Sequence, residues 1–314
     1  MSQKRVALLF SGQGAQAVGM GRELAKKYPT AEVLFARADA VLGYALSTLA
    51  WEGPEEELTR TVHCQPALFV HGLACLAVLR ELAGDFAVHA CAGLSLGEFT
   101  AHVAAGTLNF EDGLRLVAKR GRLMQEACEA VPGGMAAMIG GEESAVLQLA
   151  KDCDVDVANF NSPGQIVLSG HKAGVEEAVS LAKERGIRMA KVLNVAGAYH
   201  SRLMQPAAEA LGAALAGVAF VSPRCPVFCN VDASPVGDPE RIRATLKEQV
   251  TGSVRWTQTT ERLVDGEQCG LFLELGPGGV LAGLLARTRK GVPCLPVSDP
   301  PTLEAAVAAL RGGA

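Results

Sequence analysis

The sequence of 314 residues predicts an α/β protein: a large part built on a mostly parallel sheet, interrupted by a smaller β-α-β-β-α-β unit. Two observations lead to this prediction. Short apolar runs bounded by glycines alternate with longer segments of helical period along most of the chain. Between Gly134 and Val195 that alternation changes, because two strand-like runs follow each other with no helix between them.

Five apolar runs are expected to form the parallel sheet. They are Val6–Phe10, Val88–Ala92, Pro226–Cys229, Leu271–Leu275 and Cys294–Val297. The uncharged stretch Ala67–Leu79 between the first two is well short of the roughly 20 residues that a membrane span needs, so it indicates a buried helix. Aromatic residues make up only 5% of the chain and glycines number 35, which favours the close backbone packing of helices on a parallel sheet.

The smaller unit is expected to be ferredoxin-like, because that is the architecture of the order β-α-β-β-α-β. Its expected elements are the strand Met135–Ile139, the helix Glu142–Lys151, the strands Val155–Phe160 and Ile166–Ser169, the helix Ala173–Arg185 and the strand Met189–Val192. We therefore expect a small domain of residues 133–196, inserted into a large domain formed by residues 1–132 and 197–314. An interface between two domains is a common place for an active site.

Composition argues against several classes of function. There are 29 basic and 33 acidic residues, a net charge of −4, and no basic stripe that could bind nucleic acid. The apolar run Val6–Phe10 is too short for the core of a secretory signal. The nine cysteines are scattered, and the closest pair, Cys225 and Cys229, lacks the spacing of a metal site. We expect a cytoplasmic protein with reduced thiols, no metal, and neither a membrane nor nucleic acid as partner.

The segment Gly93-Leu94-Ser95-Leu96-Gly97 has the pattern Gly-x-Ser-x-Gly between an expected strand and an expected helix, Glu98–Ala105. Such a serine sits on a strained turn, where side chains at the two glycine positions would collide with the neighbouring helix and strand. Free N–H groups and the dipole at the start of the helix can stabilise an oxyanion there. Ser95 is therefore a candidate nucleophile, and the large domain is expected to be α/β-hydrolase-like. The alternative is that Ser95 only caps the helix.

A serine nucleophile needs a base, and three histidines follow Ser95. His102 is seven residues further along the same helix, about 10 Å away at 1.5 Å per residue, so it cannot reach the hydroxyl. His171 follows a strand in a polar turn and is expected to be solvated. His200 lies where the chain returns from the small domain, and we take it as the base; the alternative is a core or capping histidine.

Arg120 lies on the apolar face of an expected helix, Glu111–Cys128. The other charged residues of this segment form one solvated stripe, Arg115, Lys119, Arg122 and Glu126. An unpaired buried charge costs several kcal/mol. Either an internal acid such as Glu98 or Glu274 pairs with Arg120, or the guanidinium binds an anionic ligand. The candidate nucleophile in the same domain favours the ligand.

Six motifs appear together and in order along nearly the whole chain. They are Phe10-Ser11-Gly12-Gln13-Gly14-Ala15-Gln16, Gly93-Leu94-Ser95-Leu96-Gly97-Glu98, Arg120 followed by Gln125, Asn161-Ser162-Pro163-Gly164-Gln165, Gly197-Ala198-Tyr199-His200-Ser201 and Glu274-Leu275-Gly276-Pro277-Gly278. This set resembles the malonyl-CoA:acyl-carrier-protein transacylases of fatty-acid synthesis and the related acyltransferase domains of polyketide synthases. The ordered set is specific, although no single motif is.

The resemblance implies a role for each matching residue. Ser95 would be the nucleophile that is malonylated and His200 its general base and acid. The main-chain carbonyl of Gln249 would hold the histidine in place of an aspartate. The N–H groups of Gln13 and Leu96 would form the oxyanion hole. Three further residues would contact the acyl group: Arg120 would bind the malonyl carboxylate, Tyr199 would crowd a 2-methyl branch, and Asn161 would line the pocket.

The resemblance also implies the reaction and its partners. Malonyl-CoA would acylate Ser95, and the phosphopantetheine thiol of an acyl carrier protein would then accept the malonyl group. No cofactor would be bound, the carrier would be a transient partner, and the enzyme would be a discrete monomer. The sequence departs from the family pattern at Leu94, where many members have His, and at Ser11 and Ala15, which replace the common Pro and Ser. We expect altered packing at these positions without loss of activity.

The sequence is also compatible with several alternatives. The motif Gly-x-Ser-x-Gly also occurs in serine acyl hydrolases and thioesterases of the α/β-hydrolase and patatin-like classes. A further interpretation is that the protein is a non-catalytic docking module for a carrier protein. The pathway could be fatty-acid synthesis, polyketide synthesis or a malonate decarboxylase system.

Overall fold

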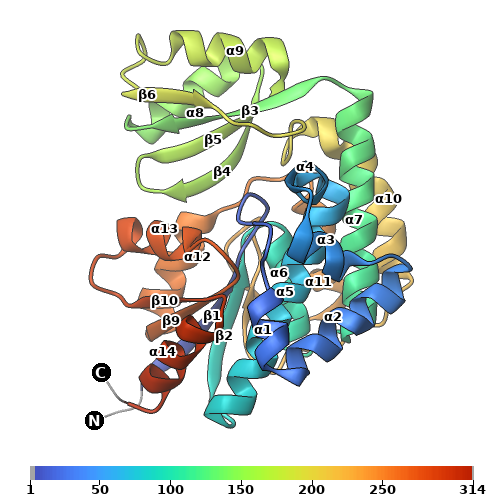
Figure 1. Ribbon diagram of the computed structural model, residues 1–314. Helices are drawn as coiled ribbons and strands as arrows, with labels where there is room; N and C mark the ends of the chain where they lie inside the picture. The colour runs from blue at the N-terminus through green and yellow to red at the C-terminus, as the bar shows by residue number, and fades with distance from the viewer. Residues whose placement is uncertain (1–3, 313–314) are drawn as a thin grey trace.

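The computed structural model describes residues 4–312 and contains two separate sheets, one mostly parallel and one antiparallel (Figure 1). The large sheet has six strands in the order β10-β9-β1-β2-β7-β8. Its strands are β1 (Arg5–Phe10), β2 (Val88–Gly93), β7 (Val227–Phe228), β8 (Pro235–Val236), β9 (Cys269–Leu275) and β10 (Cys294–Val297). The five predicted runs form the parallel strands, and the two-residue β8, which was not predicted, pairs antiparallel with β7.

Both faces of the large sheet are buried, as the apolar runs predicted. Along β1, Val6, Leu8 and Phe10 belong to one apolar core, and Ala7 and Leu9 belong to another. Successive side chains of a strand point to opposite faces, so these two cores lie on the two sides of the sheet. The helices that cover it come from all parts of the chain (Figure 1).

The helices of the large part precede and follow the small sheet along the chain. Those that precede it are α1 (Arg22–Lys27), α2 (Pro29–Leu42), α3 (Leu46–Glu52), α4 (Glu55–Thr59), α5 (Thr61–Ala83), α6 (Leu96–Ala104) and α7 (Phe110–Ala130). Those that follow it are a 3₁₀ turn (Arg202–Met204), α10 (Gln205–Ala216), α11 (Pro239–Glu248), α12 (Trp256–Glu261), a π-helical turn (Arg262–Gly266), α13 (Val280–Thr288) and α14 (Pro300–Leu310).

Helix α5 contains the stretch that predicted a buried helix. It has a window with a mean hydropathy of 1.6 and is long enough to cross a membrane, but 83% of that window is buried inside the protein. Such burial is typical of a core helix.

The small sheet contains β3 (Gly133–Ile139), β4 (Asp156–Ser162), β5 (Gln165–His171) and β6 (Met189–Val192) in the order β4-β5-β3-β6, and all neighbours are antiparallel. With α8 (Glu143–Asp152) and α9 (Lys172–Leu181) it has the predicted ferredoxin-like order and an apolar core of its own. Helix α9 ends four residues before the predicted Arg185, because the chain turns there towards Gly186, whose φ is 75°. Of the expected domains, residues 1–3 and 313–314 lie outside the described range.

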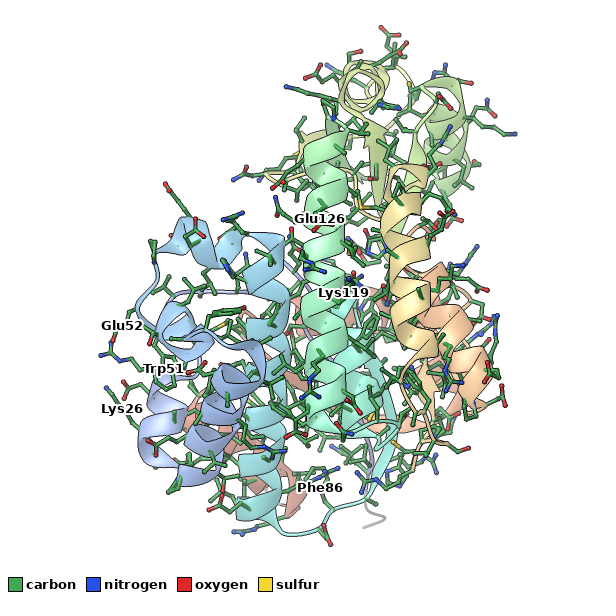
Figure 2. All side chains as sticks on the ribbon, turned by 90° about the vertical axis from the view of Figure 1, so that its right-hand side faces the viewer. Lys26, Trp51, Glu52, Phe86, Lys119 and Glu126 are labelled. Atoms are coloured by element: carbon green, nitrogen blue, oxygen red, sulfur yellow. The ribbon has the colours of Figure 1, made fainter. Side chains whose placement is uncertain are left out.

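Two connections hold the small sheet beside the carboxyl ends of β1 and β2. Helix α7 leads directly into β3, and Figure 2 shows Lys119 and Glu126 on its outer face, as the predicted solvated stripe requires. On the other side, Asn159 of β4 forms a parallel bridge with Val254, a residue of the large part. The space between the two sheets therefore has walls from both.

Candidate active site

Ser95 stands on a sharp turn between β2 and α6. Its φ of 56° and ψ of −109° lie outside the regions that serine normally adopts, a conformation that costs about 1–3 kcal/mol. A Cβ at Gly93 would lie 2.0 Å from the carbonyl of Gly97, and one at Gly97 would lie 2.2 Å from the carbonyl oxygen of Phe10. The predicted collisions at both glycine positions are therefore confirmed.

His200 contacts the Ser95 hydroxyl directly, with 2.8 Å between Nε2 and Oγ. Its other nitrogen, Nδ1, lies 2.7 Å from the main-chain carbonyl oxygen of Gln249 and 3.2 Å from that of Gly252. Because carbonyl oxygens only accept hydrogen bonds, Nδ1 carries the proton and Nε2 presents a lone pair to the hydroxyl. Burial, with a smaller effect of the Arg120 charge, lowers the pKa of His200 to about 4, so the ring is neutral at pH 7.

The other two histidines after Ser95 are placed as the sequence indicated. His102 is buried within α6, where its Nδ1 lies 3.2 Å from the hydroxyl of Thr107. His171 is exposed at the end of β5.

Arg120 is fully buried and its guanidinium reaches the nucleophile. Its Nη2 lies 2.9 Å from Ser95 Oγ and 2.7 Å from the side-chain oxygen of Gln249, and its Nη1 lies 2.8 Å from that of Gln65. In the described chain, residues 4–312, no carboxylate forms a salt bridge with it, and its Nε has no hydrogen-bond partner. Burial lowers the pKa of Arg120 only to about 10, so a positive charge is buried beside the hydroxyl.

Neither of the two acids proposed as partners of Arg120 forms an ion pair with it. Glu274 instead accepts hydrogen bonds from the amides of Leu281 and Ala282, in the first turn of α13, and from Ser11. Glu98 accepts from the Asn230 amide and from the Gln249 side chain. An anionic ligand for the buried guanidinium stays a prediction.

The two amides expected to form an oxyanion hole belong to Leu96, which follows Ser95 directly, and to Gln13, in a loop that packs against the turn at Ser95. Leu96 is the first residue of α6, and an amide in a first turn has no acceptor within its own helix. Gln13 lies in the loop after β1. That loop presses against the turn at Ser95, because a Cβ at Gly12 would lie 2.6 Å from the carbonyl oxygen of Leu94. A side chain at Gly12 would prevent this close approach.

A cavity of about 490 Å³ opens between the two sheets above Ser95. Of the predicted site residues, Gln13, Ser95, Asn161, Tyr199 and His200 line it. Arg120 and Gln249 do not line the cavity, but they contact Ser95 and His200, which do. Leu96 does not line it either and directly follows Ser95 in the chain. The buried side-chain oxygen of Asn161 has no hydrogen-bond partner among the described residues. Within that same range, no three His, Cys, Asp or Glu side chains gather as metal ligands would.

Sequence reasoning missed two residues that contact the site. Asn230 Oδ1 accepts a hydrogen bond of 2.6 Å from the Ser95 amide, and Gln65 binds Arg120. Gln65 was detectable as a polar residue beside the apolar run of α5. Asn230 follows the expected strand β7, but only the strand order shows that β7 lies next to β2.

Comparison with known proteins finds relatives over almost the whole chain. The family model of the acyl transferase domain matches residues 7–308. The malonyl CoA-acyl carrier protein transacylase of Bacillus subtilis is 42% identical, over 98% of this chain and 98% of its own. The crystal structure of an acyl-carrier-protein S-malonyltransferase from Bartonella henselae has a TM-score of 0.93 and 39% identity, covering 98% and 99% of the two chains.

A malonyl-transacylase solved in complex with a type II polyketide acyl-carrier protein has a TM-score of 0.92 and 40% identity, covering 98% of this chain and 99% of its own. Identity of this level over almost the whole chain, with the same fold, identifies a common family. The chain belongs to the acyl transferase domain family, and within it to the malonyl CoA-acyl carrier protein transacylases.

Proposed function

We propose that this protein transfers the malonyl group of malonyl-CoA to the phosphopantetheine thiol of an acyl carrier protein, through a malonyl ester of Ser95. The observation that carries the proposal is the buried guanidinium of Arg120, 2.9 Å from Ser95 Oγ and without a carboxylate partner in residues 4–312. A planar guanidinium beside the nucleophile selects an acyl group that carries its own carboxylate.

In the first half-reaction, His200 Nε2 removes the proton from Ser95 Oγ as the hydroxyl oxygen attacks the thioester carbonyl. The carbonyl oxygen of Gln249 holds Nδ1–H and stabilises the imidazolium that forms. The amides of Gln13 and Leu96 donate to the negative oxygen of the tetrahedral intermediate. When the intermediate collapses, the CoA sulfur leaves with the proton from His200, and the malonyl ester remains.

In the second half-reaction, the phosphopantetheine thiol enters the same cavity after CoA has left. His200 removes the thiol proton, the sulfur attacks the ester carbonyl, and the Ser95 oxygen recovers its proton from His200. One open cavity of about 490 Å³ above a single nucleophile suits two thiols that bind in turn, which is a ping-pong scheme.

Three residues would set the choice of acyl group. Acetyl-CoA leaves the Arg120 charge buried without its anion, so the enzyme is expected to reject it. The ring of Tyr199 forms part of the cavity wall and would crowd a 2-methyl branch. Asn161, whose side-chain oxygen has no hydrogen-bond partner within residues 4–312, also lines the cavity and would contact the substrate.

Intact mass measured after malonyl-CoA alone, and again after addition of holo carrier protein, tests the proposal. We expect a malonyl adduct that is absent in Ser95→Ala and passes to the carrier. Release of CoA and free malonate with no adduct would instead indicate a hydrolase. An adduct with methylmalonyl-CoA, formed and transferred as fast as with malonyl-CoA, would contradict the role of Tyr199.

We further propose that the protein acts in the cytoplasm as a monomer that binds its carrier transiently, in fatty-acid synthesis. The nine free cysteines and the burial of α5 support this location. The proposed steps use only side chains and amides of the chain, so they require no bound cofactor. Residues 133–196 would form a small domain inserted between residues 1–132 and 197–314, because their sheet has its own apolar core.

A further inference from the structure

We propose that Glu98 is a positioning residue for the nucleophile. Its carboxyl binds Asn230 and Gln249, the two residues whose side chains bind the backbone of Ser95 on either side. The inference rests on the proposed function, since it takes Ser95 as the nucleophile. Nothing in the proposed chemistry uses Glu98, although it lies one helical turn after Ser95 and is fully buried.

Both peptide groups of Ser95 are bound by side chains from distant segments. Its N–H donates to Asn230 Oδ1 at 2.6 Å, and its carbonyl oxygen accepts from Gln249 Nε2 at 3.0 Å. Asn230 also donates from Nδ2 to the carbonyl oxygen of Gly93 at 2.8 Å, which joins it to the strand side of the turn. These bonds hold a backbone whose φ of 56° is strained for serine.

One oxygen of Glu98 joins these two supports. Its Oε2 accepts from the main-chain N–H of Asn230 at 3.0 Å and from Nε2 of Gln249 at 3.1 Å. Its Oε1 has no hydrogen-bond partner among residues 4–312. A single oxygen of the carboxyl thus accepts both hydrogen bonds. Through them Glu98 fixes the loop after β7 and the end of α11 relative to the start of α6.

The same contact sets the orientation of the Gln249 amide. Glu98 and the Ser95 carbonyl both require a donor, so Nε2 faces them and Oε1 faces Arg120, which it accepts from at 2.7 Å. A flipped amide would place its NH₂ group against the guanidinium, with two donors facing each other. Glu98 therefore acts on two parts of the site, the angle of the nucleophile and the position of the guanidinium.

The two donors require an acceptor at the position of Glu98, but not a negative charge. Burial raises the pKa of Glu98 to about 8, so near neutral pH its carboxyl is largely protonated. Glu98→Gln keeps one oxygen for both donors in a side chain of the same shape. Glu98→Leu removes the acceptor while nearly preserving the volume, and leaves two buried donors unpaired.

The experiment compares the wild type, Glu98→Leu and Glu98→Gln by the rate of malonyl-Ser95 formation, measured by rapid quench and intact mass at several malonyl-CoA concentrations. The temperature is kept below each melting transition, as followed by circular dichroism. We expect Glu98→Leu to lower the maximal rate about 100-fold with KM little changed, because a misplacement of about 1 Å at the reacting atoms has this effect. Glu98→Gln should acylate within a few-fold of the wild type.

A folded Glu98→Leu that acylates at the wild-type rate would overturn the inference. A Glu98→Gln variant that acylates as slowly as Glu98→Leu would also overturn it, because the charge of Glu98, and not its ability to accept hydrogen bonds, would then matter. If Glu98→Leu does not fold, the Asn230→Ala variant provides the test. It removes the acceptor of the Ser95 amide but keeps the main-chain N–H that donates to Glu98. Malonyl-Ser95 formation at the wild-type rate in this variant would refute the inference that these hydrogen bonds position Ser95. Absence of an adduct in the wild type would refute the proposed function instead.

Discussion

Replacing Arg120 by alanine should remove the preference for malonyl-CoA over acetyl-CoA. The guanidinium is fully buried, and in residues 4–312 its hydrogen-bond acceptors are all neutral oxygens, those of Gln65, Ser95 and Gln249. A malonyl carboxylate would supply the missing anion. Acetyl has no group to replace it, so the two substrates differ in this one interaction.

The expected magnitude follows from the hydrogen bonds that a carboxylate would accept. Two charge-assisted bonds contribute about 1.5–3 kcal/mol each, so their loss is about 3–6 kcal/mol. At 1.4 kcal/mol per factor of ten, kcat/KM for malonyl-CoA should fall about 10²–10⁴-fold relative to that for acetyl-CoA. Loss of the bond from Arg120 to Ser95 Oγ affects both substrates, so it cancels in the ratio.

The assay measures acyl-enzyme formation by intact mass with each thioester, in the wild type and in Arg120→Ala. Arg122→Ala is the matched control, because Arg122 lies on the exposed face of the same helix, with a side chain 55% exposed. The control should keep the malonyl-to-acetyl ratio. An equal decrease for both thioesters in Arg120→Ala would show that Arg120 acts on the nucleophile alone, and the proposed carboxylate site would be wrong.

Four further outcomes are expected. The burial that lowers the pKa of His200 to about 4 keeps the base neutral, so the acid limb of kcat/KM should lie below the ordinary value of 6.5; a limb at or above 6.5 would contradict this environment. Gly97→Ala should lower the free energy of unfolding by at least about 1–3 kcal/mol, since its Cβ would lie 2.2 Å from the carbonyl oxygen of Phe10. Gly283→Ala, with open space around an exposed helical position, should instead stabilise by about 0.5–1 kcal/mol, and equal urea midpoints for the two variants would refute the steric argument. Burial raises the pKa of Glu98 from 4.5 to about 8, so the free energy of unfolding of the wild type should fall as the pH rises from 4.5 to 8. The stability of Glu98→Gln relative to the wild type should therefore increase from pH 5 to pH 8. A difference that stays constant over this range would contradict the raised pKa.

The large sheet and the nucleophile turn were predictable because their signals are local. The runs Val6–Phe10 and Val88–Ala92 are apolar and short, and the collisions at Gly93 and Gly97 follow from a turn of five residues. Strand β8, in contrast, has two residues, Pro235–Val236, and exists only because β7 offers an edge to pair with. A two-residue strand has no period that a sequence could reveal.

The partners of Arg120 were not predictable, for a different reason. Helical period shows which face of α7 is buried, but not which side chains from α5 and α11 meet it. Sequence reasoning therefore considered charged partners such as Glu98, whereas amide oxygens of Gln65 and Gln249 accept from the guanidinium. The role of the Gln249 carbonyl came from the family pattern, because a main-chain acceptor has no residue signature.

The reacting groups come from three distant stretches of the chain. Ser95 and His200 are 105 residues apart, with the whole small sheet between them, and the carbonyl that holds His200 comes 49 residues later. Contacts of such long range form late in folding, after the cost of closing large loops has been met. Regain of acyl transfer should therefore be a stringent reporter of complete refolding, and a nascent chain should carry an inert Ser95 hydroxyl until most of its length has been synthesised.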